Sequence, residues 1–120
     1  MIRKRHNYKN LKIWQQGLEI AKEISDILEK FPKHERFDLT AQISRCSISI
    51  PSNISEGSAR SDKSFSHFLD ISLGSSFELI TQLLIAHHKK YINDNTLKKF
   101  EEKISEWQKM TTGFQNSLPN

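Results

Sequence analysis

The side chains that could bind another molecule gather at the N-terminus and are basic. The first twelve residues carry no acidic side chain and hold these cations: Arg3, Lys4, Arg5, Lys9 and Lys12. The net charge of the whole chain is only +4, so the excess of positive charge lies in this segment. Clustered lysines and arginines neutralise phosphate groups, and the segment therefore indicates a nucleic-acid contact. A basic terminus that only adds to solubility is the alternative.

A second set of polar residues could act inside the fold or between copies of the chain. It follows helical spacing, with steps of three, eight and three, and contains Gln42, Arg45, Asn53 and Glu56. These residues flank an apolar stripe, where a buried polar group costs about 1–3 kcal/mol unless it is hydrogen-bonded. The set is either a polar seam between helices or subunits, or a row of ordinary flanking positions.

Catalytic and metal-binding patterns are missing from the sequence. The fifteen serines include no Gly-x-Ser-x-Gly motif, and nothing ties one serine to one histidine base. The five histidines form no His-Glu-x-x-His motif, and the single cysteine, Cys46, allows neither an intrachain disulfide nor a Cys-x-x-Cys site. We therefore expect no enzymatic activity, no metal and no cofactor, and the free thiol fits a reducing cytoplasm.

The elements that must position these residues are helices. Apolar residues recur at steps of three and four, which is the period of a helical face. The predicted helices span residues 9–31, 36–57, 62–91 and 96–118. The last of them has the strictest pattern, with apolar-face positions Leu97, Phe100, Ile104, Trp107, Thr111, Phe114 and Leu118. Asn10 and Ser61 are the expected N-caps, and Pro51 predicts a kink or a short break.

Short connections between the helices predict how they are arranged. Segments 32–35, 58–61 and 93–95 are only a few residues each, which makes consecutive helices antiparallel neighbours. We expect an all-α, antiparallel up-down-up-down four-helix bundle over residues 11–118, preceded by a basic tail over residues 1–10. This order places the tail near the 58–63 connection, where Arg60 and Lys63 extend the basic cluster. No apolar run approaches the roughly 18 residues of a membrane span, so we expect a cytoplasmic protein without membrane contact.

The second predicted helix also carries an extended motif. It consists of Leu39, Thr40, Gln42, Ser49, Ile50, Pro51, Asn53, Ile54, Glu56 and Gly57, followed by Arg60. This motif resembles the signature of the 23S rRNA-intervening sequence protein family, a bacterial family of small four-helix bundle proteins. Segments 11–15, 31–35, 68–69 and 74–78 are also similar to the family, so the resemblance spans almost the whole chain. Cys46 and Ser55 stand where the family usually has alanine, a small change in packing volume.

The resemblance implies an assembly and a set of partners. It implies a helix that passes through Pro51, and a homopentamer around a central channel. A related member, the accessory protein of diversity-generating retroelements, binds nucleic acid and partners a reverse transcriptase. We therefore expect a non-enzymatic, oligomeric accessory protein that binds RNA or DNA through its basic end. The alternative is a protein–protein adaptor or structural oligomer with no nucleic-acid role.

Overall fold

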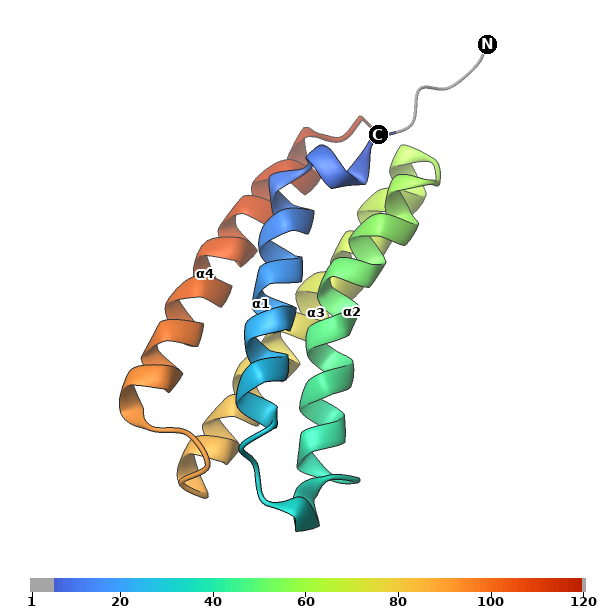
Figure 1. The fold of residues 1–120 in the computed structure, drawn as a ribbon. Coiled ribbons are helices and arrows are strands. Elements are labelled where there is room, and N and C mark those ends of the chain that lie inside the picture. The colour runs from blue at the N-terminus through green and yellow to red at the C-terminus, as the bar shows by residue number, and fades with distance from the viewer. Residues whose placement is uncertain (1–5, 120) are drawn as a thin grey trace.

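The computed structural model describes residues 6–119 and is helical throughout its regular elements (Figure 1). Four long helices follow one another: α1 (Lys12–Leu28), α2 (Leu39–Ser58), α3 (Asp62–His88) and α4 (Asp94–Ser117). Two 3-10 helices precede α1 and α2, namely η1 (Tyr8–Asn10) and η2 (Lys33–Glu35). The all-helical fold class with four long helices is confirmed for the described part of the chain.

The start of α1 differs from the prediction. Asn10 is not its N-cap, because residues 8–10 form η1, which is capped by the side chain of Asn7. Lys9 N donates to Asn7 Oδ1 at 3.3 Å, and the chain reaches α1 only after the extended residue Leu11. The apolar periodicity gave the correct face of α1, but it could not separate a 3-10 turn from the first turn of an α-helix.

Helix α2 passes through Pro51 without a break, as the resemblance implied. The expected break is therefore wrong. Pro51 is buried, and Ile50 O beside it accepts a 2.7 Å hydrogen bond from the buried Ser72 hydroxyl of α3. Other serine hydroxyls of α2 bond within the helix, since Ser55 and Ser58 each donate to the carbonyl three residues earlier.

Helix α3 begins where the sequence predicts and ends earlier. Ser61 is its N-cap and accepts a hydrogen bond from Ser64 N at 3.2 Å. At the other end Lys90 has a φ of 65°, and Tyr91 N donates to Ala86 O at 2.9 Å. This is the Schellman arrangement that closes many helices, here without the usual glycine. Asn93 then caps α4, so α4 starts within the segment predicted to be a turn.

The core lies along the axis between the four helices. Its largest fully buried side chains come from all four helices and include Ile24, Ile43, Ile54, Phe65, Leu69, Leu83, Ile104 and Trp107. The indole of Trp107 keeps its donor satisfied at depth, because Nε1 donates to Ile13 O at 2.8 Å. Gly17 permits this packing, since a Cβ there would lie 3.2 Å from Ile50 Cγ2 and 3.4 Å from Trp107 Nε1.

Contacts between helices run in opposite order along the chain. Ile13 and Glu23 of α1 pair with Trp107 and Lys99 of α4, so the residue numbers fall on one helix as they rise on the other. Between α2 and α3, Cys46 contacts Gln82 and Ser49 contacts Ser75. These contacts are compatible with the expected antiparallel order, and the four long helices lie side by side in Figure 1.

Candidate nucleic-acid interface and polar seam

The basic residues that the structure describes lie at one end of the molecule. Arg3, Lys4 and Arg5 fall outside the described residues. Lys9 is exposed on η1 and Lys12 is exposed at the start of α1. Arg60 and Lys63 are exposed where α2 gives way to α3, and η1 packs against α2. In Figure 1 the N-terminal segment, η1 and the connection between α2 and α3 all lie at the same end.

Arg60 and Lys63 differ in what surrounds them. The guanidinium of Arg60 lies 4.9 Å from the centre of the Phe68 ring and 3.5 Å from a carboxylate oxygen of Glu56. Both side chains of that ion pair are more than half exposed, so the pair is weak and salt-sensitive. Lys63 lines a cavity of about 350 Å³ between the start of α3 and the end of α4, together with Asp62, Ser66, Gln115, Leu118 and Pro119.

The aromatic rings of the N-terminal segment pack on the bundle. The imidazole of His6 lies edge-on to Phe65 and Phe114, at 5.3 and 5.8 Å between ring centres. Tyr8 lies edge-on to Trp14 at 5.1 Å. Both His6 and Tyr8 are half-buried. The sequence gave no sign of this docking, because the partner rings lie on α1, α3 and α4.

The polar set Gln42, Arg45, Asn53 and Glu56 does not form one connected seam. Gln42 is exposed and its amide donates to Asp38 Oδ1 at 3.2 Å. Asn53 is half-buried and its amide donates 2.8 Å bonds to both Ser49 O and Ser49 Oγ. Glu56 lies farther along α2, with Arg60. The structure therefore brings Gln42 and Arg45 together, adds Asn53 through Ser49, and leaves Glu56 at the basic end.

A polar cavity between α2 and α3 joins Gln42 and Arg45 to residues that the sequence did not single out for a site. Its volume is about 350 Å³, and its other lining residues are Cys46, Ser49, Ser75, Glu78 and Gln82. The Cys46 thiol donates to Glu78 Oε2 at 3.2 Å and accepts from Gln82 Nε2 at 3.3 Å. Burial raises the pKa of the Cys46 thiol, and the Glu78 carboxylate raises that pKa further. The thiol is therefore a protonated packing group rather than a nucleophile.

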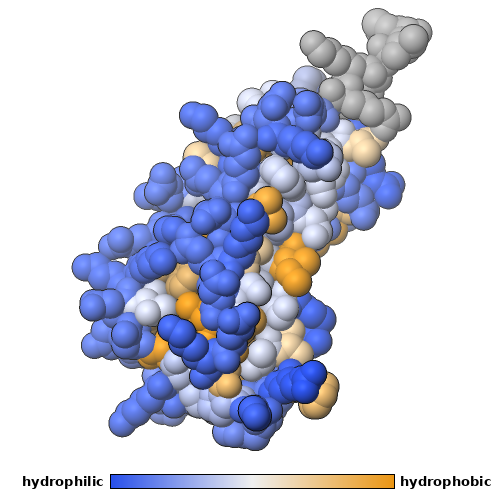
Figure 2. Space-filling view, in the orientation of Figure 1, coloured by the Kyte–Doolittle hydropathy of each residue, from blue (hydrophilic) through white to orange (hydrophobic). Residues whose placement is uncertain are grey.

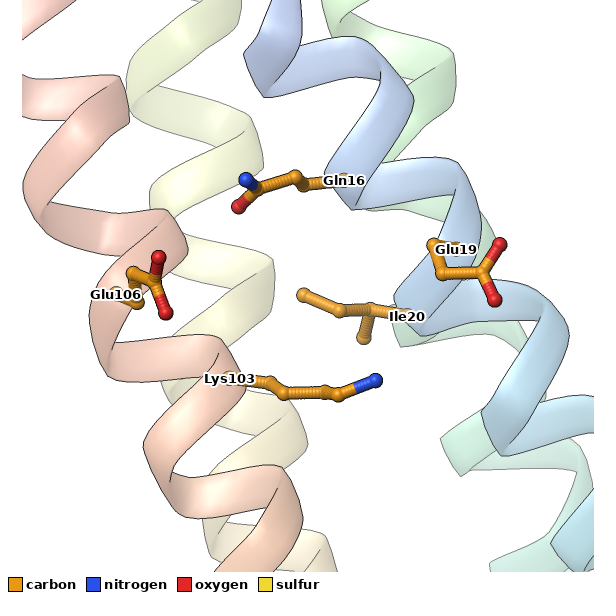
Figure 3. Close-up of a pocket in the computed structure, with 5 residues that line it drawn as sticks. All are labelled: Gln16, Glu19, Ile20, Lys103 and Glu106. Atoms are coloured by element: carbon orange, nitrogen blue, oxygen red, sulfur yellow. The ribbon is translucent and has the colours of Figure 1, made fainter.

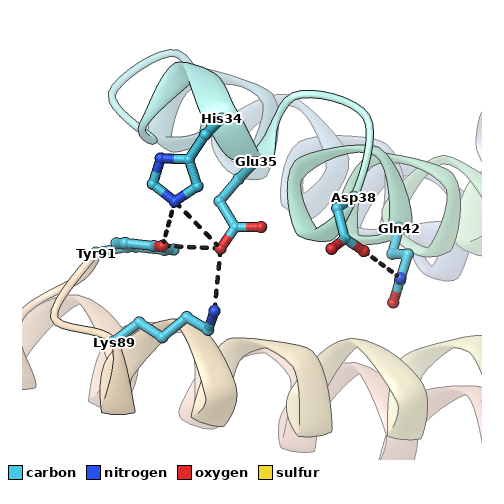
Figure 4. Close-up of polar contacts among 6 residues, drawn as sticks. All are labelled: His34, Glu35, Asp38, Gln42, Lys89 and Tyr91. Atoms are coloured by element: carbon cyan, nitrogen blue, oxygen red, sulfur yellow. Dashed lines mark hydrogen bonds and ion pairs between the residues drawn. The ribbon is translucent and has the colours of Figure 1, made fainter.

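A second polar cluster lies at the end of the molecule opposite the basic residues (Figure 4). The carboxylate of Glu35, on η2, is buried and accepts hydrogen bonds from Tyr91 Oη at 2.8 Å and Lys89 Nζ at 3.2 Å. The Tyr91 hydroxyl and the Lys89 ammonium hold the pKa of Glu35 below its ordinary value. The sequence suggested a balanced, solvated end here, and it missed Glu35 because the partners lie more than fifty residues away.

A shallow cavity of about 230 Å³ opens between α1 and α4 (Figure 3). Gln16 and Ile20 of α1 and Lys103 of α4 point into this space. Lys103 also pairs with Glu23, which bonds Lys99 at 3.0 Å as well. Burial raises the pKa of Glu23, but the hydrogen bonds from these two lysines outweigh it and lower the pKa overall. The cluster fastens α1 to α4 and leaves the cavity itself without a charge in search of a partner.

Helix α3 presents an apolar outer face. Ile71, Phe77, Leu84 and Ile85 are 40%, 60%, 46% and 44% exposed. No lysine or arginine occurs between Lys63 and Lys89. By length and composition alone α3 could cross a membrane, although a core helix of a bundle meets the same test and a third of its apolar stretch is buried. The face bearing α1 and α4 is mostly hydrophilic by contrast (Figure 2).

Comparisons with known proteins agree with the motif in α2. A family profile described as 23S rRNA-intervening sequence protein matches residues 9–113. A crystal structure from Bacteroides thetaiotaomicron VPI-5482, of a protein of unknown function from the S23 ribosomal protein family, has the same fold. Its TM-score is 0.80 at 22% identity, covering 88% of this chain and 96% of that one. A search of curated proteins gives no match. Because the family match extends over most of the sequence, the chain belongs to the 23S rRNA-intervening sequence protein family.

Proposed function

We propose that this protein is a non-enzymatic, homo-oligomeric accessory factor that binds RNA or DNA through its basic end. The observation that carries the proposal is the placement of Lys9, Lys12, Arg60 and Lys63 at one end of the molecule. These four cations come from three separate elements, so their meeting depends on the fold and not on a run of basic residues. Arg3, Lys4 and Arg5 precede them in the chain.

The charge at this end is only partly neutralised within the chain. Glu56 pairs with Arg60 at a solvent-exposed position, and Asp62 pairs with His6 at 3.6 Å. Phosphate groups carry more charge than these two carboxylates and are the natural partners of such a surface. Contacts of this kind position a nucleic acid without reading its sequence, so we propose binding with little base specificity.

We also propose that the chain assembles with copies of itself in the antiparallel bundle form, as the homopentamer that the family resemblance implies. The support is the apolar outer face of α3, because a face with four exposed large apolar side chains and few charges loses free energy in water. Five copies would place five basic ends in a ring and multiply the attraction for a polyanion. The same burial of α3 favours a cytoplasmic assembly over a membrane-embedded helix.

A non-enzymatic role is supported by what the serine hydroxyls do. Ser47, Ser55, Ser58 and Ser76 each donate to a backbone carbonyl three residues earlier. A hydroxyl engaged in this way lacks the neighbouring base that a nucleophilic serine requires. Cys46 is held as a thiol beside Glu78, which opposes thiolate formation.

Fluorescence anisotropy with a short labelled RNA, and with DNA of the same sequence, tests the nucleic-acid role. We expect binding at low salt that weakens steeply as salt rises, with log K falling by roughly 0.7–0.9 per phosphate neutralised. Replacing Arg3, Lys4, Arg5, Lys9 and Lys12 with serine should weaken binding and flatten the salt dependence.

The matched control replaces five exposed lysines that lie elsewhere, Lys22, Lys30, Lys33, Lys98 and Lys109, with serine. It removes the same charge from the chain and should bind more tightly than the N-terminal variant. Equal losses in the two variants would show that net charge alone drives binding. Absence of binding by the unmodified protein at low salt would refute the nucleic-acid role.

The alternative is a protein–protein adaptor, and the apolar face of α3 is the observation that favours it. A reverse transcriptase is one partner to test, because a related accessory protein has such a partner. Co-purification that survives nuclease and high salt would favour the adaptor. Loss of the partner on nuclease treatment would favour a shared nucleic acid.

A further inference from the structure

We propose that His6 is a positioning residue, which docks the basic N-terminal segment onto the end of the bundle beside Arg60 and Lys63. This inference rests on the proposed nucleic-acid role and adds a residue that carries out no phosphate contact itself. In this role His6 determines where the neighbouring cations lie, and Arg3, Lys4, Arg5 and Lys9 deliver the contact.

The dock is a three-ring cluster closed by an ion pair. The His6 ring lies edge-on to Phe65 at the start of α3 and to Phe114 near the end of α4, and these two rings lie 5.6 Å apart. His6 Nε2 lies 3.6 Å from Asp62 Oδ1. About a third of each of these two side chains is exposed, so the contact is partly shielded from water. Edge-on ring pairs of this kind each contribute beyond their buried area.

A second anchor follows immediately along the chain. Gln15 Nε2 donates to Lys9 O at 2.8 Å, and Tyr8 packs on Trp14. His6 is therefore the outermost described contact of the segment with the bundle. If it is lost, the next anchor lies at Tyr8 and Lys9, so that more of the chain becomes free.

The length of free chain sets how far the tail cations can move. From a docked His6, Arg3 lies three residues away, at most about 10 Å. From an anchor at Tyr8 it lies five residues away, at most about 17 Å, so the volume it samples grows by about a factor of five. A cation held near the surface has a higher effective concentration at the phosphates that Arg60 and Lys63 contact. Loss of the dock should therefore weaken binding by about threefold to tenfold.

Positioning and charge have different signatures in a salt titration. The slope of log K against log salt counts the phosphates neutralised, and this count stays the same when the tail cations remain. Removal of His6 should therefore lower affinity at every salt concentration and leave the slope unchanged. Removal of a contacting lysine lowers both.

The test compares His6→Ala, His6→Phe and the unmodified protein, with His88→Ala as the matched control at an exposed histidine of the opposite end. RNA binding is measured by anisotropy at four salt concentrations. Docking is measured separately by the rate at which trypsin cleaves the bond after Lys9. We expect His6→Ala to weaken binding, keep the slope and cleave faster, His6→Phe to lie between, and His88→Ala to match the unmodified protein.

Each outcome decides between the ideas. If the unmodified protein binds no nucleic acid, the proposed function fails and the cleavage rates alone report on the dock. If it binds and His6→Ala binds equally well, the positioning role is overturned while the proposed function stands. A changed slope in His6→Ala would show a direct phosphate contact and also overturn positioning. If His6→Ala lowers the melting temperature by unfolding the bundle end, His6→Phe, which keeps a ring between Phe65 and Phe114, decides by the same two readouts.

Discussion

Glu35 is a carboxylate on a single 3-10 turn that holds two distant parts of the chain together. Its oxygens accept hydrogen bonds from Tyr91 and Lys89, which follow the end of α3, and the His34 ring lies 3.9 Å away. A buried carboxylate is costly unless it is bonded in this way. The cluster therefore fixes the connection before α2 against the connection before α4.

The charge of Glu35 makes this contact dependent on pH. Because its pKa in the folded protein is lowered, it stabilises the fold above the ordinary pKa of a glutamate, about 4.3, and this stabilisation is lost as the pH falls through the folded pKa. Glu35→Gln should therefore be less stable than the unmodified protein at pH 7, and the difference should shrink toward pH 3. Urea unfolding at several pH values measures it.

The control for this prediction is Glu101→Gln, an exposed glutamate on α4. It should change stability little at either pH, because exposed charges interact weakly through water. If Glu35→Gln and Glu101→Gln have the same pH dependence, the Glu35 cluster contributes no specific stability.

At the scale of elements, α2 and α3 form the closest pair of helices, and Gly57 shows why. A Cβ at this position would lie 2.8 Å from both Phe65 Cδ1 and Phe68 Cβ. Such a distance is shorter than real contacts, so the two helices would have to separate at the end where Phe65 also holds His6. The glycine of the sequence motif is therefore a packing requirement of the α2–α3 crossing.

Gly57→Ala should lower the free energy of unfolding by about 1–3 kcal/mol, because added volume strains a packed contact. Gly113→Ala is the matched control, since nothing lies within 4 Å of a Cβ there. That variant should be more stable by about 0.5–1 kcal/mol, because alanine restricts the unfolded chain more than glycine does. Urea unfolding at one fixed protein concentration measures both, and equal effects would contradict the packing argument.

Elements with a regular pattern could be predicted from the sequence, and contacts between distant residues could not. The step pattern of α4 identified its core face, since Phe100, Ile104 and Trp107 are almost fully buried. The end of α3 was placed too late because Lys90 adopts a left-handed conformation without the glycine that usually marks it. The dock of His6 depends on where α3 and α4 meet, and no local pattern encodes that.

The candidate site divides in the same way. The sequence supplied the basic residues and the topology that gathers Arg60 and Lys63 at their end. The sequence treated Gln42, Arg45, Asn53 and Glu56 as one set because of their spacing, whereas their partners differ. A helical step predicts that residues share a face, and partners on α3 decide whether they share a contact.

At the scale of the whole molecule, the outer face of α3 is the surface on which the proposed assembly depends. Phe77 is 60% exposed, so a charge at this position is solvated in a single chain and repelled in a contact between copies. Phe77→Glu should keep its helical circular dichroism and reduce the particle mass toward the 14.0 kDa of one chain. Light scattering measures the mass.

Thr112→Glu, at an exposed position of α4, is the control for a charge added elsewhere. It should leave the mass of the assembly unchanged. An unmodified protein that is already a 14 kDa particle would refute the homopentamer.

The absence of lysine and arginine from most of α3 gives the two proposed contacts opposite responses to ionic strength. Salt screens the attraction between the basic end and phosphates, whereas an apolar contact is left intact or strengthened by salts such as sulfate. Washing the complex with concentrated sulfate should therefore release bound nucleic acid from a particle that stays whole. One purification step can separate the cargo from its carrier, and the carrier can then be loaded again at low salt.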